Sequence, residues 1–415
     1  MSVPKTFEDL TWLPDWEEGM RSHFHQTILR YWADTMVDET HGGFYGRRDG
    51  RDRLLPTAGK GVILNARILW TFAQAARLFP DMNYQALAQR SFLYLSEHFH
   101  DAEHGGVYWM LDATGQPTER KKQLYAQAFA MYGYTEYFRL TQEPKALALA
   151  QELFRVMEAH GYDTQHNGYW EAFGPGWEPI EDVRLSEKDA NATKTMNTHL
   201  HILEAYTNLY RVWPHPQVGH QLKNLILLFL QRFISPEGHF HLFFNDAWEL
   251  QSHEISFGHD IEGSWLLYEA AEVLGEEELL VRVREVALQM VDRTLSEGMD
   301  ADGGLMNEAD PNGFTDTDKH WWPQAEALVG LVNAFQLSQN AWYLDMAQQT
   351  WQFIQKNLVD TEFGEWHWRV TRSGERVWTE DKAGPWKCPY HNGRALMECH
   401  LRLTQVIQSF TPQQS

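Results

Sequence analysis

The sequence predicts an all-α fold, an (α/α)6 barrel of six inner and six outer helices with short β-hairpins at one end. Three observations predict it. A glycine-centred aromatic segment recurs six times, two helix-length segments lie between successive copies, and one set of these helical segments is far more apolar than the other. Internal repeats of this length indicate a structure built from one repeated supersecondary unit.

The recurring segment defines the repeats. It reads HGGFYG at 41, EHGGVYW at 103, HNGYWE at 166, PEGHFHLFF at 236, DGGLMNE at 302 and FGEWHWRV at 363. The glycines at 43, 106, 168, 238, 304 and 364 are therefore 63, 62, 70, 66 and 60 residues apart. Glycine among aromatic and β-branched residues is typical of a tight hairpin. No linker rich in Pro, Gly or Ser divides the repeats, so we predict a single catalytic domain over 1–415.

Each repeat contributes one inner and one outer helix. Segments that follow the hairpins are apolar almost all round and cover 59–79, 123–140, 195–212, 258–274, 322–338 and 389–408. Segments that precede the hairpins are more polar and cover 15–36, 83–99, 144–160, 216–234, 277–297 and 341–357. A helix that is apolar all round is buried, whereas an amphipathic one lies at the surface. Because every hairpin leads into an inner helix, the six inner N-termini meet at one end, where we expect a pocket.

Composition limits the possible partners. The chain has 35 basic and 57 acidic residues, a formal net charge of −22, which argues against binding nucleic acid or an anionic membrane. No segment approaches the ~20 apolar residues of a membrane span. The only cysteines, Cys388 and Cys399, favour a reducing, cytoplasmic location. Aromatic residues make up 13%, which suits a saccharide ligand, and the sequence predicts no oligomeric state.

Polar side chains cluster at the predicted starts of the inner helices. On the third, Asn197, His201, Glu204 and Asn208 follow one another at helical steps and share one face. On the fourth, His259 and Glu262 share the first turn, and on the fifth Trp322 and Glu326 share a face. The remaining three inner helices contribute Arg67, Tyr125, Trp386, His391 and Arg394. The set converges on one pore.

This combination favours proton abstraction next to a carbonyl. Histidine titrates near neutrality, so it can both remove and return a proton. A place in the first helical turn favours the neutral imidazole at His259 and His391. Arg67 supplies fixed charge for an oxyanion, and Trp322 and Trp386 offer flat faces for a sugar.

Two other classes of protein remain open. A glycosidase on the same fold needs two carboxylates flanking the scissile bond, and Glu262, Glu326 or Asp189 could supply them. A catalytically silent sugar-binding or protein-binding toroid would keep the fold without turnover, and the three histidines argue against it.

The sequence predicts neither a metal nor a cofactor. The pairs His199-x-His201 and His239-x-His241 resemble ligand spacing, but alternate residues on a helix point apart. No HExxH motif occurs, and no phosphate-cradling glycine loop precedes a helix. We therefore expect activity without added metal or nucleotide.

Four long segments, MNTHLHILEAYTNLYRVW, SFGHDIEGSWLL, DTDKHWWPQAEALVG and WKCPYHNGRALME, resemble the N-acylglucosamine 2-epimerase family. NARILWTFA and DAEHGGVYWM extend the likeness over nearly the whole chain. The resemblance implies an (α/α)6 barrel and an isomerase that interconverts the reducing-end glucose and mannose of β-1,4-linked disaccharides such as cellobiose and lactose. N-acylglucosamine epimerisation and mannose or other aldose–ketose isomerisation stay open within the family.

The resemblance also implies roles for the site residues. His259 and His391 act as the acid/base pair on opposite faces of C2, and His201 assists at the C2 oxygen. Arg67 and Asn197 hold the oxygens of a cis-enediolate, and Glu262 orients His259 and helps to open the ring. With Glu326, the predicted substrate-binding residues are Arg67, Tyr125, Asp189, Asn197, Glu262, Trp322, Glu326 and Trp386. Cys388 departs from the family pattern, since glycine is expected beside Trp386.

Overall fold

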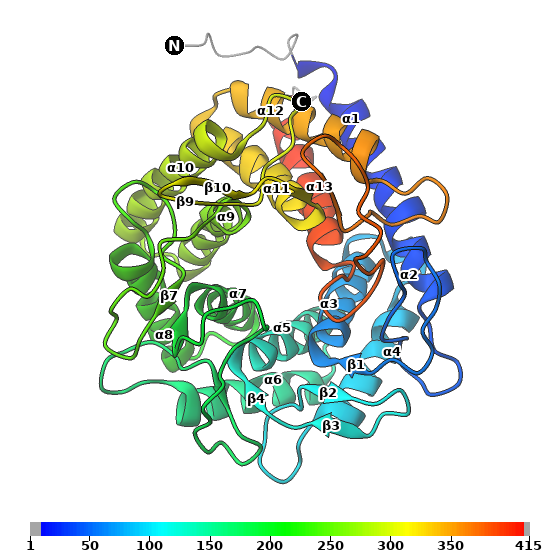
Figure 1. The fold of residues 1–415 in the computed structure, drawn as a ribbon, viewed down its shortest axis with the longest axis vertical. Helices are drawn as coiled ribbons and strands as arrows, with labels where there is room; N and C mark the ends of the chain where they lie inside the picture. The colour runs from blue at the N-terminus through cyan, green and yellow to red at the C-terminus, as the bar shows by residue number, and fades with distance from the viewer. Residues whose placement is uncertain (1–9, 411–415) are drawn as a thin grey trace, which may run out of the picture.

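A computed structural model describes residues 10–410, and in this part of the chain the helices form two concentric rings (Figure 1). The inner ring contains α3 (Val62–Leu78), α5 (Leu124–Thr141), α7 (Met196–Val212), α9 (Phe257–Leu274), α11 (Trp321–Ser338) and α13 (Tyr390–Phe410). The outer ring contains α1 (Leu13–His23) continued by α2 (Arg30–Thr35), then α4 (Gln85–Tyr94), α6 (Pro144–Val156), α8 (Pro216–Leu228), α10 (Glu277–Gly298) and α12 (Trp342–Phe353). The predicted fold class is confirmed.

The two rings differ in burial as the sequence patterns predict. In α3 every residue from Val62 to Ala76 is buried. In α10 only a stripe that includes Leu279, Val283 and Ala287 is buried, and acidic and basic residues cover the other face. Five outer helices include a π-helical turn, at Phe24–Leu29, Leu95–Phe99, Met157–Gly161, Phe229–Phe233 and Ile354–Leu358, and a short 3-10 turn covers Pro80–Met82.

The six glycine segments differ slightly from the predicted hairpins. Each is a tight turn closed by an isolated bridge, as between Val37 and Phe44 or between His100 and Val107. Gly43 has a φ of +61°, and a Cβ there would lie 2.6 Å from the Tyr94 ring, so this position needs glycine.

The regular strands join neighbouring repeats. The pairs are β1 (Lys60–Gly61) with β2 (Met110–Leu111), β4 (Lys122–Gln123) with β5 (Ala172–Phe173), β6 (Lys194–Thr195) with β7 (Phe243–Phe244), β8 (Ile255–Ser256) with β9 (Glu308–Asp310), and β11 (Lys319–His320) with β12 (Arg369–Val370). β3 (Pro117–Glu119) and β10 (Gly313–Asp316) extend two of these pairs. A bridge between Arg48 and Ala383 joins the first repeat to the last. Together with α1 packed on α13, it closes the ring (Figure 1).

An ion pair with a buried lysine joins most turns to the following inner helix, and its aspartate is also buried in every such pair except that of Asp302. In five repeats the lysine near the inner helix contacts an aspartate of the preceding turn: Lys60 with Asp38, Lys122 with Asp101, Lys194 with Asp163, Lys319 with Asp302 and Lys382 with Asp360, at 2.5–2.7 Å. In the fourth repeat His239 and Asp260 make the equivalent contact at 2.7 Å. These pairs fix the end of the barrel that carries the inner N-termini.

Replacing Lys122 by methionine should destabilise the protein by about 3–5 kcal/mol, because Asp101 then stays buried without its cation. Chemical denaturation checks this value. Arg30→Met is the control, since Arg30 and Asp34 form a pair on the surface, where ion pairs contribute below about 1 kcal/mol. Equal losses in the two variants would contradict the prediction.

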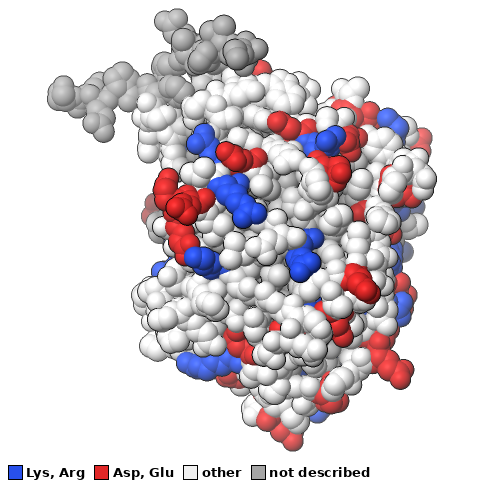
Figure 2. Space-filling model, turned by 90° about the vertical axis from the view of Figure 1, so that its left-hand side faces the viewer, with Lys and Arg blue, Asp and Glu red and all other residues white. Residues whose placement is uncertain are grey.

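Charged side chains are spread over the surface. Figure 2 shows acidic and basic side chains interspersed on one face of the molecule, without a continuous basic patch on that face. No helix among the described residues is long and apolar enough to cross a membrane.

Candidate active site

The N-terminal ends of the inner helices surround a cavity of about 550 Å³, which we call the front cavity. All six inner helices or the segments just before them contribute to its wall. Of the predicted site residues, Arg67, Tyr125, Asp189, Asn197, His201, His259, Glu262, Trp322, Trp386 and His391 line it. Glu326 does not line the cavity and lies fully buried beneath its floor.

Among the described residues, His259 has a hydroxyl partner and no carboxylate partner. It is the third residue of α9, and its Nδ1 lies 2.8 Å from the Oγ of Ser256 on β8. Burial lowers the pKa of His259 to about 4. The structure differs here from the expectation that Glu262 orients His259, because a Glu262 oxygen contacts Arg394 instead. His259 is therefore a neutral imidazole at neutral pH.

His391 does have a carboxylate partner. Its Nδ1 lies 2.7 Å from Glu326 Oε1 and 3.8 Å from Glu262 Oε1. Burial lowers the pKa of His391 well below its usual value and raises the pKa of Glu326. Both shifts favour one proton shared by the two groups over a charged pair. His391 can therefore give a proton to a ligand in the cavity and regain one from Glu326 through the hydrogen bond between them.

His201 is held by its own helix. Its Nδ1 lies 2.9 Å from Glu204 Oε2, one turn further along α7, and its ring packs edge-on against Tyr125 at 4.9 Å. Burial lowers the pKa of His201, although the hydrogen bond to Glu204 opposes the shift. The i, i+3 spacing read from the sequence accounts for this contact.

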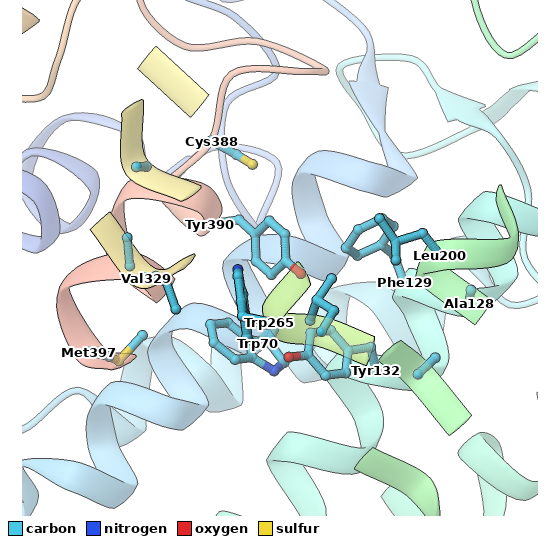
Figure 3. Close-up of a cluster of buried hydrophobic side chains, with 14 of the residues drawn as sticks. Trp70, Ala128, Phe129, Tyr132, Leu200, Trp265, Val329, Cys388, Tyr390 and Met397 are labelled. Carbon is cyan, nitrogen blue, oxygen red and sulfur yellow. The ribbon is translucent and has the colours of Figure 1, made fainter. Parts of the chain in front are cut away.

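A buried cluster of charge closes the floor of the front cavity. The Arg394 guanidinium bonds Glu204, Glu262 and Glu326, which come from three different inner helices. It lies 4.8 Å from the Trp265 ring and 4.3 Å from the Tyr390 ring. Figure 3 shows these two rings packed with Trp70 and Tyr132 in the middle of the barrel. We call this layer of charge and aromatic rings the septum.

Three ligand atoms of Glu262, Glu326 and His391 lie close enough together to hold a metal ion. However, Arg394 Nη2 already donates to Oε1 of Glu262 and to Oε1 of Glu326. The guanidinium therefore supplies the positive charge that a metal ion would supply at these carboxylates. His199, which the sequence places two residues before His201, bonds Thr195 and Tyr169 through its two nitrogens.

Exhaustive chelation should therefore leave turnover unchanged within error. The measurement is the rate of sugar conversion before and after treatment with EDTA and gel filtration. Loss of the rate, with recovery on one added divalent ion, would show that a metal displaces Arg394 from the carboxylates.

Four polar atoms of residues at the front cavity have no partner among the described residues: Arg67 Nε, Asn197 Oδ1, Glu262 Oε2 and Trp321 Nε1. Arg67 lies 4.2 Å from the Phe129 ring and donates to the Tyr125 hydroxyl at 2.7 Å, which fixes its direction. A site that offers a fixed cation together with free donors and acceptors suits an oxygen-rich ligand whose charge changes.

Two tryptophans form apolar walls. The Trp322 ring centre lies 4.8 Å from the His259 ring and 5.6 Å from the His391 ring, so Trp322 contacts both histidines. Trp386 lies 6.1 Å from Tyr125. It reaches the cavity because six residues, 384–389, separate the bridging Ala383 from α13, whereas the other inner helices directly follow their strands.

Several wall residues were missed by sequence reasoning. They are Leu185, Ser186, Glu187, Lys188, Asn307, Glu308, Asp316, His320, Trp321 and Trp368. Asn307 and Glu308 are the last two residues of the DGGLMNE segment, so the repeat pattern itself could have indicated them. Residues 185–189 belong to a long loop between β5 and β6 that no helical or strand pattern marks.

An (α/α)6 barrel with four histidines, an arginine and four tryptophans around one polar cavity is equipped for acid–base chemistry on a small hydroxylated molecule. The family model for N-acylglucosamine 2-epimerase (GlcNAc 2-epimerase) matches residues 43–395. The chain is 47% identical to a cellobiose 2-epimerase of Bacteroides fragilis over 92% of this chain and 98% of the relative.

The solved structures agree with this match. The cellobiose 2-epimerase of Bacillus thermoamylovorans has a TM-score of 0.90 at 37% identity, covering 94% of this chain and 100% of that one. A D-mannose isomerase at 18% identity shares the fold, with a TM-score of 0.82 over 94% and 97% of the two chains. The chain belongs to the N-acylglucosamine 2-epimerase family and is an enzyme that acts on carbohydrates.

Proposed function

We propose that this protein is a disaccharide 2-epimerase, which interconverts the reducing-end glucose and mannose of cellobiose and lactose. One observation carries the proposal. His259 and His391 both lie close to the Trp322 ring, in a cavity that also contains an arginine held in a fixed position. The 47% identity to a cellobiose 2-epimerase over most of both chains supports the same activity.

Proton transfer at C2 uses the different surroundings of the two histidines. The neutral His259 removes the C2 proton of the ring-opened sugar, and His391 delivers a proton to the opposite face while Glu326 restores it through the 2.7 Å contact. In the reverse reaction the roles exchange. After product release, solvent removes the proton from His259 and returns one to the Glu326–His391 pair.

The enediolate is stabilised by the groups left unpaired. Arg67 faces the developing negative charge, and burial among aromatic rings strengthens that attraction. Asn197 and His201 bind the sugar oxygens nearby. Glu262, through its free Oε2, takes the O1 proton as the C1–O5 bond breaks and returns that proton to O5. Trp322 and Trp386 stack on the sugar rings, and Tyr125 and Asp189 bind hydroxyls. Glu326 acts as a positioning residue for His391.

Ser256 positions His259 through its hydroxyl. Replacing Ser256 by alanine should lower kcat about three- to tenfold, the value of one hydrogen bond, because the imidazole loses its only described partner. Ser256→Thr keeps the hydroxyl and should retain most of the rate. Steady-state kinetics on cellobiose checks both variants. An alanine variant with full kcat would remove the serine from this role.

The decisive experiment is a product assay with cellobiose. The expected product is glucosyl-mannose, separated from glucosyl-fructose by anion-exchange chromatography. Parallel reactions with mannose and N-acetylglucosamine test the other activities of the family. Free glucose as the product would instead show a glycosidase, and sugar binding without turnover would show a silent toroid.

The whole ring acts as one catalytic domain in this proposal, since all six repeats contribute to the cavity and the Arg48–Ala383 bridge joins the ends. The predicted domain 1–415 includes residues 1–9 and 411–415, which lie outside the described residues. A reducing, cytoplasmic compartment fits the buried free thiols of Cys388 and Cys399.

A further inference from the structure

A second cavity lies on the other side of the septum, and the proposed function does not use it. It measures about 420 Å³ and is lined by the second halves of all six inner helices, from Trp70 and Arg77 on α3 to Arg402 and Gln405 on α13. We call it the rear cavity. Glu204 forms part of its wall and also bonds His201 of the front cavity, so a single side chain separates the two cavities at this point.

The rear cavity is rich in charge, but the charges nearly cancel. Four arginines and five glutamates line it. The ion pairs are Arg77 with Glu136 at 2.9 Å, Arg139 with Glu136 at 2.8 Å, Arg211 with Glu269 at 2.7 Å and Arg402 with Glu398 at 3.3 Å. Glu204 is neutralised by Arg394 of the septum, and Glu272 is exposed at the rim. A phosphate or a free cation would have to break one of these pairs, so the cavity favours an uncharged ligand.

Buried hydrogen-bond donors of the rear cavity lack partners among the described residues. They are Asn333 Nδ2 and Trp70 Nε1. Asn333 is 1% exposed and Trp70 is 3% exposed. The Asn333 oxygen is already used, since it accepts from Arg402 Nη1 at 2.9 Å. Buried donors are normally satisfied, so this cluster indicates a ligand that carries acceptor oxygens.

The same cavity offers flat aromatic surface. Trp70 and Tyr132 stack at 5.1 Å with an interplanar angle of 19°, and Tyr268 adds a third ring. The volume lies within the about 300–1,000 Å³ of small-molecule sites. Aromatic faces beside amides and paired charges suit a pyranose, which presents C–H bonds on its faces and hydroxyls at its rim.

We propose that the rear cavity is a second binding site for a neutral saccharide of one or two sugar units, held by Asn333 and Trp70. This site is separate from the front cavity and independent of the reaction proposed there.

The test is a titration of the full chain with methyl β-D-glucopyranoside, followed by calorimetry and by soaking of crystals. The methyl acetal cannot open, so the probe stays unchanged in either cavity. We expect two bound sugars per chain, one of them in the rear cavity. Asn333→Leu should raise the Kd of the rear sugar at least tenfold and leave kcat/KM for cellobiose within about twofold. Trp322→Ala should weaken only the front sugar.

Trp70→Phe serves as a second variant, because it keeps an aromatic ring at this position while it removes the indole N–H donor. It should also weaken the rear sugar, with an unchanged melting temperature as the control for folding. Binding confined to the front cavity, or rear binding that neither variant weakens, would overturn the proposal. Failure of the epimerase assay would leave the rear titration readable, since it involves no turnover.

Discussion

Alanine at His259 or at His391 is expected to lower kcat for cellobiose by about 10²- to 10⁴-fold, the usual value of a general acid–base step. Each substitution removes one proton-transfer partner and leaves the Trp322 ring that contacts both histidines. KM should therefore change little, and the lower kcat should reflect a slower chemical step. Steady-state kinetics with purified variants measures the effect.

His199→Ala is the matched control for these two variants. His199 is also a buried histidine near the start of an inner helix, but its nitrogens bond Thr195 and Tyr169 and it does not line the front cavity. Its loss should lower the melting temperature while kcat stays near the native value. Near-native kcat in either catalytic variant would remove that histidine from the mechanism.

The sequence predicts the barrel well because helical periodicity determines both the position and the burial of its helices. On α7 the predicted polar stripe of Asn197, His201, Glu204 and Asn208 is real, and it runs through three layers. The first two residues line the front cavity, Glu204 belongs to the septum and Asn208 lines the rear cavity. Spacing along one helix could therefore place these residues correctly.

Contacts between helices could not be predicted in the same way. His391 on α13 bonds Glu326 on α11, and His259 bonds Ser256 from the preceding strand rather than Glu262 on its own helix. These partners depend on how far apart the helices lie and on which rotamers the septum allows. Repeat spacing predicts the order of the helices around the ring, but it does not predict the distances between them.

Loops account for the other residues that were missed. Residues 185–188 and Asp316 on β10 contribute to the front cavity without any periodic pattern. Their positions follow from pairing with neighbouring repeats, as when β8 pairs with β9 and brings Glu308 beside Ser256. Only the assembled ring defines such contacts.

In D2O, the mannose-type product formed from cellobiose should carry deuterium at C2 from the first turnover. His259 removes one proton and His391 delivers another, and the two side chains come from different inner helices and both lie near the Trp322 ring. Protons on imidazole nitrogen exchange rapidly with solvent, so the delivered atom is deuterium. Proton NMR at C2 and mass spectrometry of the separated product measure the label.

The label separates this mechanism from its alternatives. A glycosidase would release glucose without label at C2, and a silent toroid would label nothing. The control is the His259→Ala variant, which should neither form the epimer nor label the remaining cellobiose, because the first proton is never removed. An epimer that keeps its original C2 hydrogen would contradict the two-histidine mechanism and would require transfer within the sugar, by a single base or by a transient oxidation.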